Sequence, residues 1–347
     1  MNGFPLGFPS PLFWAMEGKN TGEALPDYLL GFLKGCEVHD GISHNALTLF
    51  PITCPQSGSL PSILTLDEAV EKKLLKISEV GREGTVNKIR LLNSSQHYVF
   101  IMAGEILIGC KQDRTLEEDI LLAPNTEEIT ASAFCVEAGR WHRVSDEFIP
   151  AEEAATPRVR QVARLTRSQS AVWNEIAYFH MALNIKAGTG ALREVYITPK
   201  TKDTIKEYMK VMGELPESLP QVSGVAVAIG GKLLCLDLFC DKKMFDALYP
   251  KLLKSYAVEA MIESEKKDGI SKEKMALFIN SLLNGKAKHM DSPGAGEHWE
   301  LVAKDAQGSC LVFEGNVLHL SAFPRKTHEQ RRSSTGRTRT FPRFFEL

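Results

Sequence analysis

Two apolar segments separated by a glycine pair constrain the fold of this chain more than any other feature. Residues 225–229 (VAVAI) and 233–238 (LLCLDL) flank Gly230-Gly231. Glycine adopts the positive φ angles of tight hairpin turns without steric cost, so this pattern is typical of a β-hairpin. We therefore predict two antiparallel strands over residues 222–239.

Strand and helix signals fill most of the remaining chain. Strand-type residues predict strands at 45–52, 85–92, 97–110, 120–123 and 129–137, and a last hairpin joining 298–303 with 309–323 through residues 314–316. Gly104 predicts a bend or bulge within residues 97–110. Apolar residues at helical spacing predict helices at 24–36, 65–75, 158–187, 245–262 and 266–288. The expected fold is α+β, with a β-rich core of antiparallel and mixed strands and several packed helices.

Composition along the chain predicts three parts. Residues 1–23 are rich in Pro, Gly and Phe and are expected to form an irregular arm. Residues 24–324 are expected to form a single α+β domain, with two lobes at about 24–150 and 151–324 as the alternative. Residues 325–347 hold seven Lys or Arg against two Glu, and we expect a disordered basic tail.

Bulk charge and cysteine content point to no special partner. The net charge of −2 gives no general attraction to nucleic acid or to an acidic membrane surface, so we expect neither partner. No run of about 18 apolar residues is present, and prolines interrupt the apolar N-terminus, which argues against a signal peptide.

Seven scattered cysteines without C-x-x-C spacing favour a reducing compartment, so the expected location is cytoplasmic. Phosphate-loop, dinucleotide, zinc-protease and serine-hydrolase motifs are missing, and we expect no cofactor.

Charged and polar residues gather near the ends of two predicted strands, at 104–114 and 137–141. If these ends meet, cations could bind phosphate or carboxylate oxygens, two carboxylates could act as general acid and base, and an indole could stack on a base or sugar. The candidate cations are Lys111, Arg114 and Arg140, the carboxylates are Glu105 and Glu137, the indole is Trp141, and Gln112 lies beside them. Alternatively, the charges form structural ion pairs and the indole fills core.

The other candidates have simpler structural interpretations. Gln169 and Trp173 are four residues apart on one helical face and could line the same pocket, although core packing explains them as well. Asp237 is a carboxylate inside an apolar strand, which requires a partner or a solvent-facing position. His319 and the loop histidines at 39 and 44 could act at a metal, but structural roles are more common, and no metal site is predicted.

Several of these blocks resemble a known family. AGEILIGCKQDR, CVEAGRW, SQSAVW, and VAVAIGGK followed by LDLF are similar to the family of the ARG and rhodanese-phosphatase-superfamily-associated protein domain. The resemblance covers about residues 24–324. Cys110 and Cys235 stand where a small residue is expected, and residues 266–294 are a local variation. A cupin-like barrel is the alternative, but the closely spaced metal-binding histidines of that fold are lacking.

The resemblance implies a link to ADP-ribose or phosphorylated-nucleotide metabolism by association, because the activity of the family is not settled. Its motif falls on the cluster at 105–141, with Gln169, Trp173 and Asp237 as secondary positions. Two hypotheses follow. In the first, the chain binds or processes an ADP-ribose-like or phosphorylated small molecule in a charged pocket; in the second, it senses such a ligand or a protein partner without turnover. The second predicts that both carboxylates are locked in salt bridges.

Overall fold

The structure is a computed structural model, and it describes residues 22–58, 60–81, 85, 87–263 and 269–325. The predicted arm at 1–23 lies almost wholly outside these residues, as does the predicted tail beyond Arg325. The fold is α+β, as predicted. Among the described residues, no helix is both long and apolar enough to cross a membrane.

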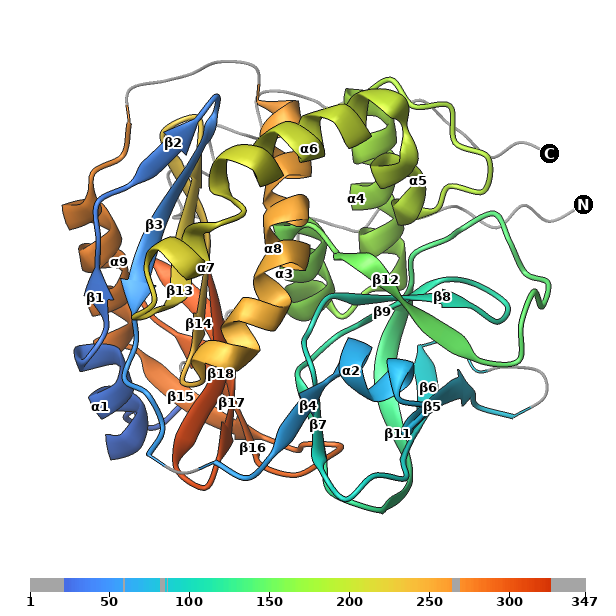
Figure 1. Cartoon of the computed structure of the whole chain (residues 1–347), viewed down its shortest axis with the longest axis horizontal. Coiled ribbons are helices and arrows are strands. Elements are labelled where there is room, and N and C mark those ends of the chain that lie inside the picture. Colours follow the sequence, from blue (N-terminus) through green and yellow to red (C-terminus); the bar gives the residue numbers. More distant parts are fainter. Residues whose placement is uncertain (1–21, 59, 82–84, 86, 264–268, 326–347) are drawn as a thin grey trace, which may run out of the picture.

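A nine-stranded sheet forms one side of the molecule (Figure 1). Its order is β1-β3-β13-β14-β18-β17-β16-β15, and β2 also pairs with β3. The strands are β1 (Glu37–Val38), β2 (Ile42–His44), β3 (Leu47–Thr53), β13 (Val222–Ile229), β14 (Lys232–Phe239), β15 (Lys286–Met290), β16 (Glu297–Val302), β17 (Ala306–Phe313) and β18 (Asn316–Pro324). Because β3 pairs with β13 and β14 pairs with β18, strands from residues 37–53 and from residues 222–324 build this sheet together.

The hairpin predicted from the glycine pair is confirmed. β13 and β14 pair antiparallel, and both Gly230 (φ 54°) and Gly231 (φ 70°) have positive φ angles. A turn with two positive φ angles has a backbone twist that matches the right-handed twist of the flanking strands. All of β13 is buried, which fits the apolar run at residues 225–229.

Two smaller sheets form the other side of the molecule. One has the order β10-β7-β4 and the other β12-β8-β9-β11-β6-β5. Their strands are β4 (Ile63–Thr65), β5 (Leu75–Glu79), β6 (Lys88–Asn93), β7 (Tyr98–Ile101), β8 (Glu105–Gly109), β9 (Arg114–Leu116), β10 (Ile120–Leu122), β11 (Thr126–Cys135) and β12 (Phe148–Ala154). They enclose a second apolar core, built from residues 64–148.

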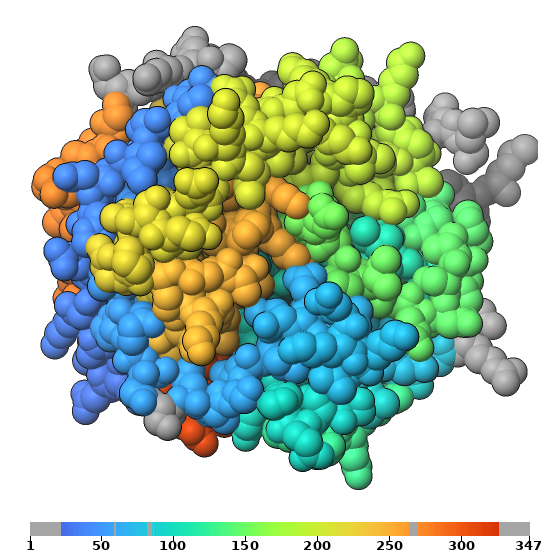
Figure 2. All heavy atoms as spheres, in the orientation of Figure 1, coloured from blue at the N-terminus to red at the C-terminus, as the bar shows by residue number. Residues whose placement is uncertain are grey.

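Helices lie between these units and around them. In Figure 1, α8 runs between the nine-stranded sheet and the smaller sheets, with α6, α4 and α5 above it. Figure 2 shows that α8 reaches the surface between α7 and α2. The helices are α1 (Asp27–Lys34), α2 (Leu66–Glu71), α3 (Pro157–Thr166), α4 (Gln169–Ala182), α5 (Leu192–Ile197), α6 (Pro199–Met212), α7 (Leu215–Ser218), α8 (Lys242–Ile262) and α9 (Lys272–Leu283).

Local signals placed several boundaries correctly. Thr65 and Glu68 form the predicted capping box at the start of α2. Gly104 (φ 89°) occupies the turn between β7 and β8, where a Cβ atom would lie 2.4 Å from Cδ of Arg160. The turn therefore requires glycine both for its backbone angle and for the close approach of α3.

Several predicted elements differ from the structure. The helix predicted at 65–75 ends at Glu71, and Leu75 begins β5. The helix at 158–187 is divided into α3 and α4, because Arg167 adopts a left-handed conformation (φ 48°) and the Ser168 side chain caps the second helix. The helix at 266–288 is shorter, with residues 286–288 in β15, which pairs with β16; residues 264–268 lie outside the described ones. The last hairpin is a three-stranded meander, because a further turn separates β16 from β17.

Candidate functional site

The two strand ends that carry the predicted site residues meet in space. The guanidinium of Arg140 donates to the Cys110 carbonyl at 2.8 Å and to the Gly109 carbonyl at 3.3 Å. The side chain of Gln112 donates to the Glu137 carbonyl at 2.7 Å. The loop after β8 and the loop after β11 therefore form one unit, which we call the Arg140 cluster (residues 109–113 and 137–141).

Glu137 is buried at the centre of the Arg140 cluster. Its carboxylate accepts hydrogen bonds from Arg140 Nε at 2.8 Å, from the Thr189 hydroxyl at 2.8 Å and from the Asp113 backbone N–H at 3.1 Å. Burial raises the pKa of Glu137, but the hydrogen bonds from Arg140 and Thr189 outweigh it and hold the pKa below its usual value. Glu137 is thus a charged group whose lone pairs are already engaged.

Asp113 is a second buried carboxylate of the cluster, which the sequence did not single out. It lies 3.0 Å from Arg140 Nη2 and 3.1 Å from Arg193 Nε. Burial and the nearby charge of Glu137 raise the pKa of Asp113. Two arginines and two carboxylates thereby join the loops of β8 and β11 to the start of α5.

Glu105 belongs to a different part of the molecule. It lies at the opposite end of β8, and its carboxylate is 2.8 Å from Lys251 Nζ on α8. Lys251 also contacts Asp67 on α2 at 2.6 Å. Both Glu105 and Lys251 are buried, and burial raises the pKa of Glu105 against the opposing effect of Lys251. This ion pair connects α8 to the smaller sheets.

Arg114 and the two helical candidates also have structural contacts. The guanidinium of Arg114 is fully buried, 3.3 Å from Glu79 on β5, and it contacts the Cys135 thiol. The Gln169 side chain accepts from the Cys135 N–H at 2.8 Å and donates to the Cys135 carbonyl at 2.7 Å. Gln169 thus joins the start of α4 to β11. Its side-chain amide pairs with the backbone N–H and carbonyl of Cys135, as the backbone of a neighbouring strand would. Trp173 is partly buried against the main core.

Lys111 and Trp141 form the outward face of the Arg140 cluster. The Lys111 ammonium lies 5.3 Å from the centre of the Trp141 ring, within cation–π distance. The Trp141 side chain is 50% exposed, although large aromatic side chains are usually well buried. The rigid network behind it fixes the loop that presents this indole.

Asp237 is paired inside the core rather than placed on a solvent-facing edge. Arg160 on α3 donates to both of its oxygens at 2.8 Å, and the Tyr256 hydroxyl donates at 2.6 Å. His319 Nε2 lies 3.4 Å from Asp237, and His319 Nδ1 lies 2.9 Å from Asp119. Burial opposes ionisation of Asp237, but Arg160 outweighs it and lowers the pKa.

The histidines considered as metal ligands have other contacts. His39 is hydrogen bonded to Thr53 at 2.7 Å, and His44 to Glu207 at 2.7 Å. Within the described part of the chain, no group of three or more His, Cys, Asp or Glu side chains is arranged to hold a metal ion.

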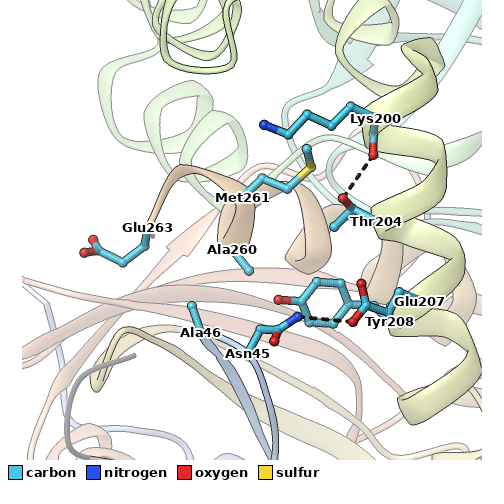
Figure 3. Close-up of a pocket in the computed structure, with 9 residues that line it drawn as sticks. All are labelled: Asn45, Ala46, Lys200, Thr204, Glu207, Tyr208, Ala260, Met261 and Glu263. Carbon is cyan, nitrogen blue, oxygen red and sulfur yellow. Dashed lines mark hydrogen bonds between the residues drawn. The ribbon is translucent and has the colours of Figure 1, made fainter. Parts of the chain in front are cut away.

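Two clefts lie away from the Arg140 cluster. The first, of about 370 Å³, lies between the turn after β2, α6 and the end of α8. In Figure 3 the Tyr208 ring and the Asn45 side chain lie on one side of this cleft and Lys200 on another. The second, of about 280 Å³, lies between the end of α3 and the β16–β17 hairpin. Neither cleft is lined by a predicted site residue.

The structure therefore divides the predicted site. It brings together Lys111, Gln112, Glu137, Arg140 and Trp141. The side chains that pair elsewhere are Glu105, Arg114, Gln169 and Asp237, and Trp173 packs against the main core. The role of each in function stays a prediction.

The fold and the site define a mixed α+β protein whose charged residues form buried networks between sheets and helices. The family model of the ARG and Rhodanese-Phosphatase-superfamily-associated Protein domain matches residues 35–323, and the chain belongs to this family. Comparison with curated proteins gives no match, and comparison with solved structures gives none either.

Sequence reasoning did not anticipate the arginines of α3. Arg158, Arg160 and Arg164 each pair with an acidic residue, and Arg167 follows directly after the helix. Four arginines within ten residues (RVRQVARLTR) are a signal that could have marked this segment.

Proposed function

We propose that this protein binds a phosphorylated small molecule of the ADP-ribose type without using Glu105 or Glu137 for chemistry. The pairing of both carboxylates in buried salt bridges carries this proposal. A general acid or base must come within hydrogen-bond reach of the substrate, and its pKa should lie near the working pH. Glu137 has a lowered pKa, and Glu105 faces Lys251 inside the protein.

The binding surface that we propose is the outward face formed by Lys111 and Trp141. An exposed indole can stack on an adenine ring, and an ammonium can attract phosphate oxygens. The Arg140 cluster holds both residues on a rigid base, which limits the entropy lost when a ligand binds. The link of the family to ADP-ribose metabolism supports this ligand class by association.

The alternative is that the same face contacts a protein partner. Trp141, Val144 and Ile149 are large apolar side chains exposed on or beside the loop after β11. Exposed aromatic and aliphatic residues close together are common at protein interfaces.

Whether the ligand is a small molecule or a protein, we expect a cytoplasmic protein, because all seven cysteines are free thiols.

Thermal-shift measurements with ADP-ribose, AMP and inorganic phosphate test the proposal. At a ligand concentration of about 100 Kd, binding stabilises the folded state by about 2.7 kcal/mol. We expect Trp141→Ala to weaken ADP-ribose binding by about 5- to 150-fold, because base stacking contributes ~1–3 kcal/mol. Lys206→Ala, which removes an exposed ammonium on α6 and keeps the indole, is a surface control and should leave binding unchanged.

Chromatography of ADP-ribose after incubation with the protein separates binding from turnover. The proposal expects an unchanged nucleotide. Turnover that disappears in Glu137→Gln while the variant stays folded would establish the enzyme hypothesis instead. The absence of a thermal shift with all three ligands would reject this ligand class and favour the protein-partner alternative.

A further inference from the structure

The side chain of Arg164 lies buried at the second cleft without hydrogen-bond partners. It lies on the last turn of α3 and is 9% exposed. None of its three guanidinium nitrogens, Nε, Nη1 or Nη2, has a hydrogen-bond partner among the described residues. A buried guanidinium carries five N–H donors, and leaving them without acceptors is costly. Something outside the described side chains is therefore expected to supply acceptors.

The nearest carboxylates do not fill this role. Glu118 Oε2 lies 3.5 Å from Arg164 Nη1, and Glu300 Oε1 lies 4.0 Å from Arg164 Nη2. The same oxygen of Glu300 accepts a hydrogen bond from Arg167 Nη2 at 2.8 Å. Arg167 Nε also contacts Glu117 at 3.1 Å. Glu117 and one oxygen of Glu300 thus pair with Arg167, whereas Glu118 lies at ion-pair distance from Arg164 without forming a hydrogen bond.

The cleft in front of Arg164 has the size of a small metabolite. Its volume is about 280 Å³, just below the range of about 300–1,000 Å³ that is common for small-molecule sites. It is lined by Arg164, Arg167, Glu300 and Gln307, together with Leu165 and the facing residues of β16 and β17. Its wall thus combines a guanidinium, a carboxylate and an amide with a few apolar groups.

The charge around the cleft selects between ligand classes. Two arginines (164 and 167) line it, and three glutamates (117, 118 and 300) lie within 4.0 Å of their guanidinium groups, so the formal charges of these five residues sum to −1. A simple anion would add negative charge where carboxylates already predominate. A molecule that carries both a carboxylate and an ammonium adds no net charge and can satisfy both kinds of group.

We propose that this cleft binds a small zwitterion of amino-acid size, with its carboxylate on Arg164 and its ammonium directed to Glu300. The planar guanidinium donates two parallel hydrogen bonds to a carboxylate, which a lysine ammonium cannot reproduce. Gln307 is available at the wall to bind a further polar group. This site is independent of the face formed by Lys111 and Trp141.

Ligand-observed NMR with the standard L-amino acids, followed by calorimetry of the strongest binder, tests the proposal. Glycine, acetate and methylamine form the minimal comparison, because they carry both charged groups, the carboxylate alone and the ammonium alone. We expect the zwitterion to bind about tenfold or more tightly than either single-charge probe. Acetate binding as tightly as glycine would overturn the zwitterion assignment.

Two substitutions connect binding to the cleft. Arg164→Lys should weaken amino-acid binding by about tenfold or more, because lysine keeps the positive charge but cannot donate two parallel hydrogen bonds to the carboxylate. Arg158→Lys is the matched control, since it makes the same change on the same helix at the ion pair with Glu259. Glu300→Gln should weaken amino-acid binding, because the ammonium loses its carboxylate partner, and should strengthen acetate binding, because a negative charge is removed. This variant tests the proposal even if Arg164→Lys does not fold.

Three results would overturn the proposal. One is that no amino acid binds the wild-type protein. Another is that the affinity is the same in Arg164→Lys or Glu300→Gln as in the wild type. The third is equal weakening by Arg158→Lys. Loss of ADP-ribose binding in Trp141→Ala is a separate readout, so failure of one site does not imply failure of the other.

Discussion

Replacing Asp237 with asparagine would remove the negative charge at the centre of the network between α3, α8 and β18. Asp237 is fully buried and accepts hydrogen bonds from Arg160, twice, and from Tyr256. Asparagine keeps the shape of the side chain but replaces one acceptor with an amide donor. Arg160 would remain as a buried cation without its counter-ion.

The expected loss of stability follows from this burial. Breaking a buried ion pair by removing one partner costs about 3–5 kcal/mol. The entropy of unfolding is about 2.1 cal/mol/K per residue, or about 0.6 kcal/mol/K for roughly 300 folded residues. Tm should therefore fall by about 5–8 °C in Asp237→Asn.

Calorimetric melting of the wild type and the variant measures this change. Asp203→Asn on α6 is the matched control, because Asp203 is exposed and surface substitutions usually change stability by less than about 0.5 kcal/mol. The double variant Asp237→Leu/Arg160→Met should be more stable than Asp237→Asn, since it leaves no unpaired charge. A Tm for Asp237→Asn within about 1 °C of the wild type would refute the reasoning.

The stabilisation from His319 should be complete below about pH 6.5 and should disappear as the pH rises through about 9. Burial lowers the pKa of this imidazole, but Asp119 and Asp237 outweigh it and raise the pKa to about 9, above the unfolded value. Urea unfolding of the wild type and His319→Gln across this range should show a difference that shrinks with rising pH; a constant difference would contradict the assignment. Gly104→Ala should lower stability by about 1–3 kcal/mol, because it combines a positive φ with a clash against Arg160. Gly31→Ala, with open space around it, should cause no loss, and equal denaturation midpoints for the two variants would refute this.

Signals that depend on a few neighbouring residues predicted the fold best. Gly230-Gly231 predicted its hairpin, and Thr65 with Glu68 predicted the start of α2. Arg167 shows where such signals fail, because the helical spacing continues through it while its backbone turns left-handed. The contacts of Arg167 with Glu117 and Glu300, far away in the sequence, accompany this turn.

The candidate site shows the same division between local pattern and long-range packing. The sequence alone does not show that the strand ends after β8 and β11 converge; in the structure the hydrogen bond from Arg140 to the Cys110 carbonyl brings them together. Glu105 lies on β8, the strand that leads into this loop, but its side chain pairs with Lys251 on α8. Strand alternation tells which residues share a face, but not which element covers that face.

The sequence by itself determined that certain charges needed partners, because a carboxylate such as Asp237 within an apolar strand is costly to bury alone. Only the tertiary structure decided which partners these are. Arg160 is 77 positions from Asp237, and Lys251 is 146 positions from Glu105. Coulombic attraction and hydrogen bonding act over a few ångströms, so such pairs form only after the sheets and helices have packed.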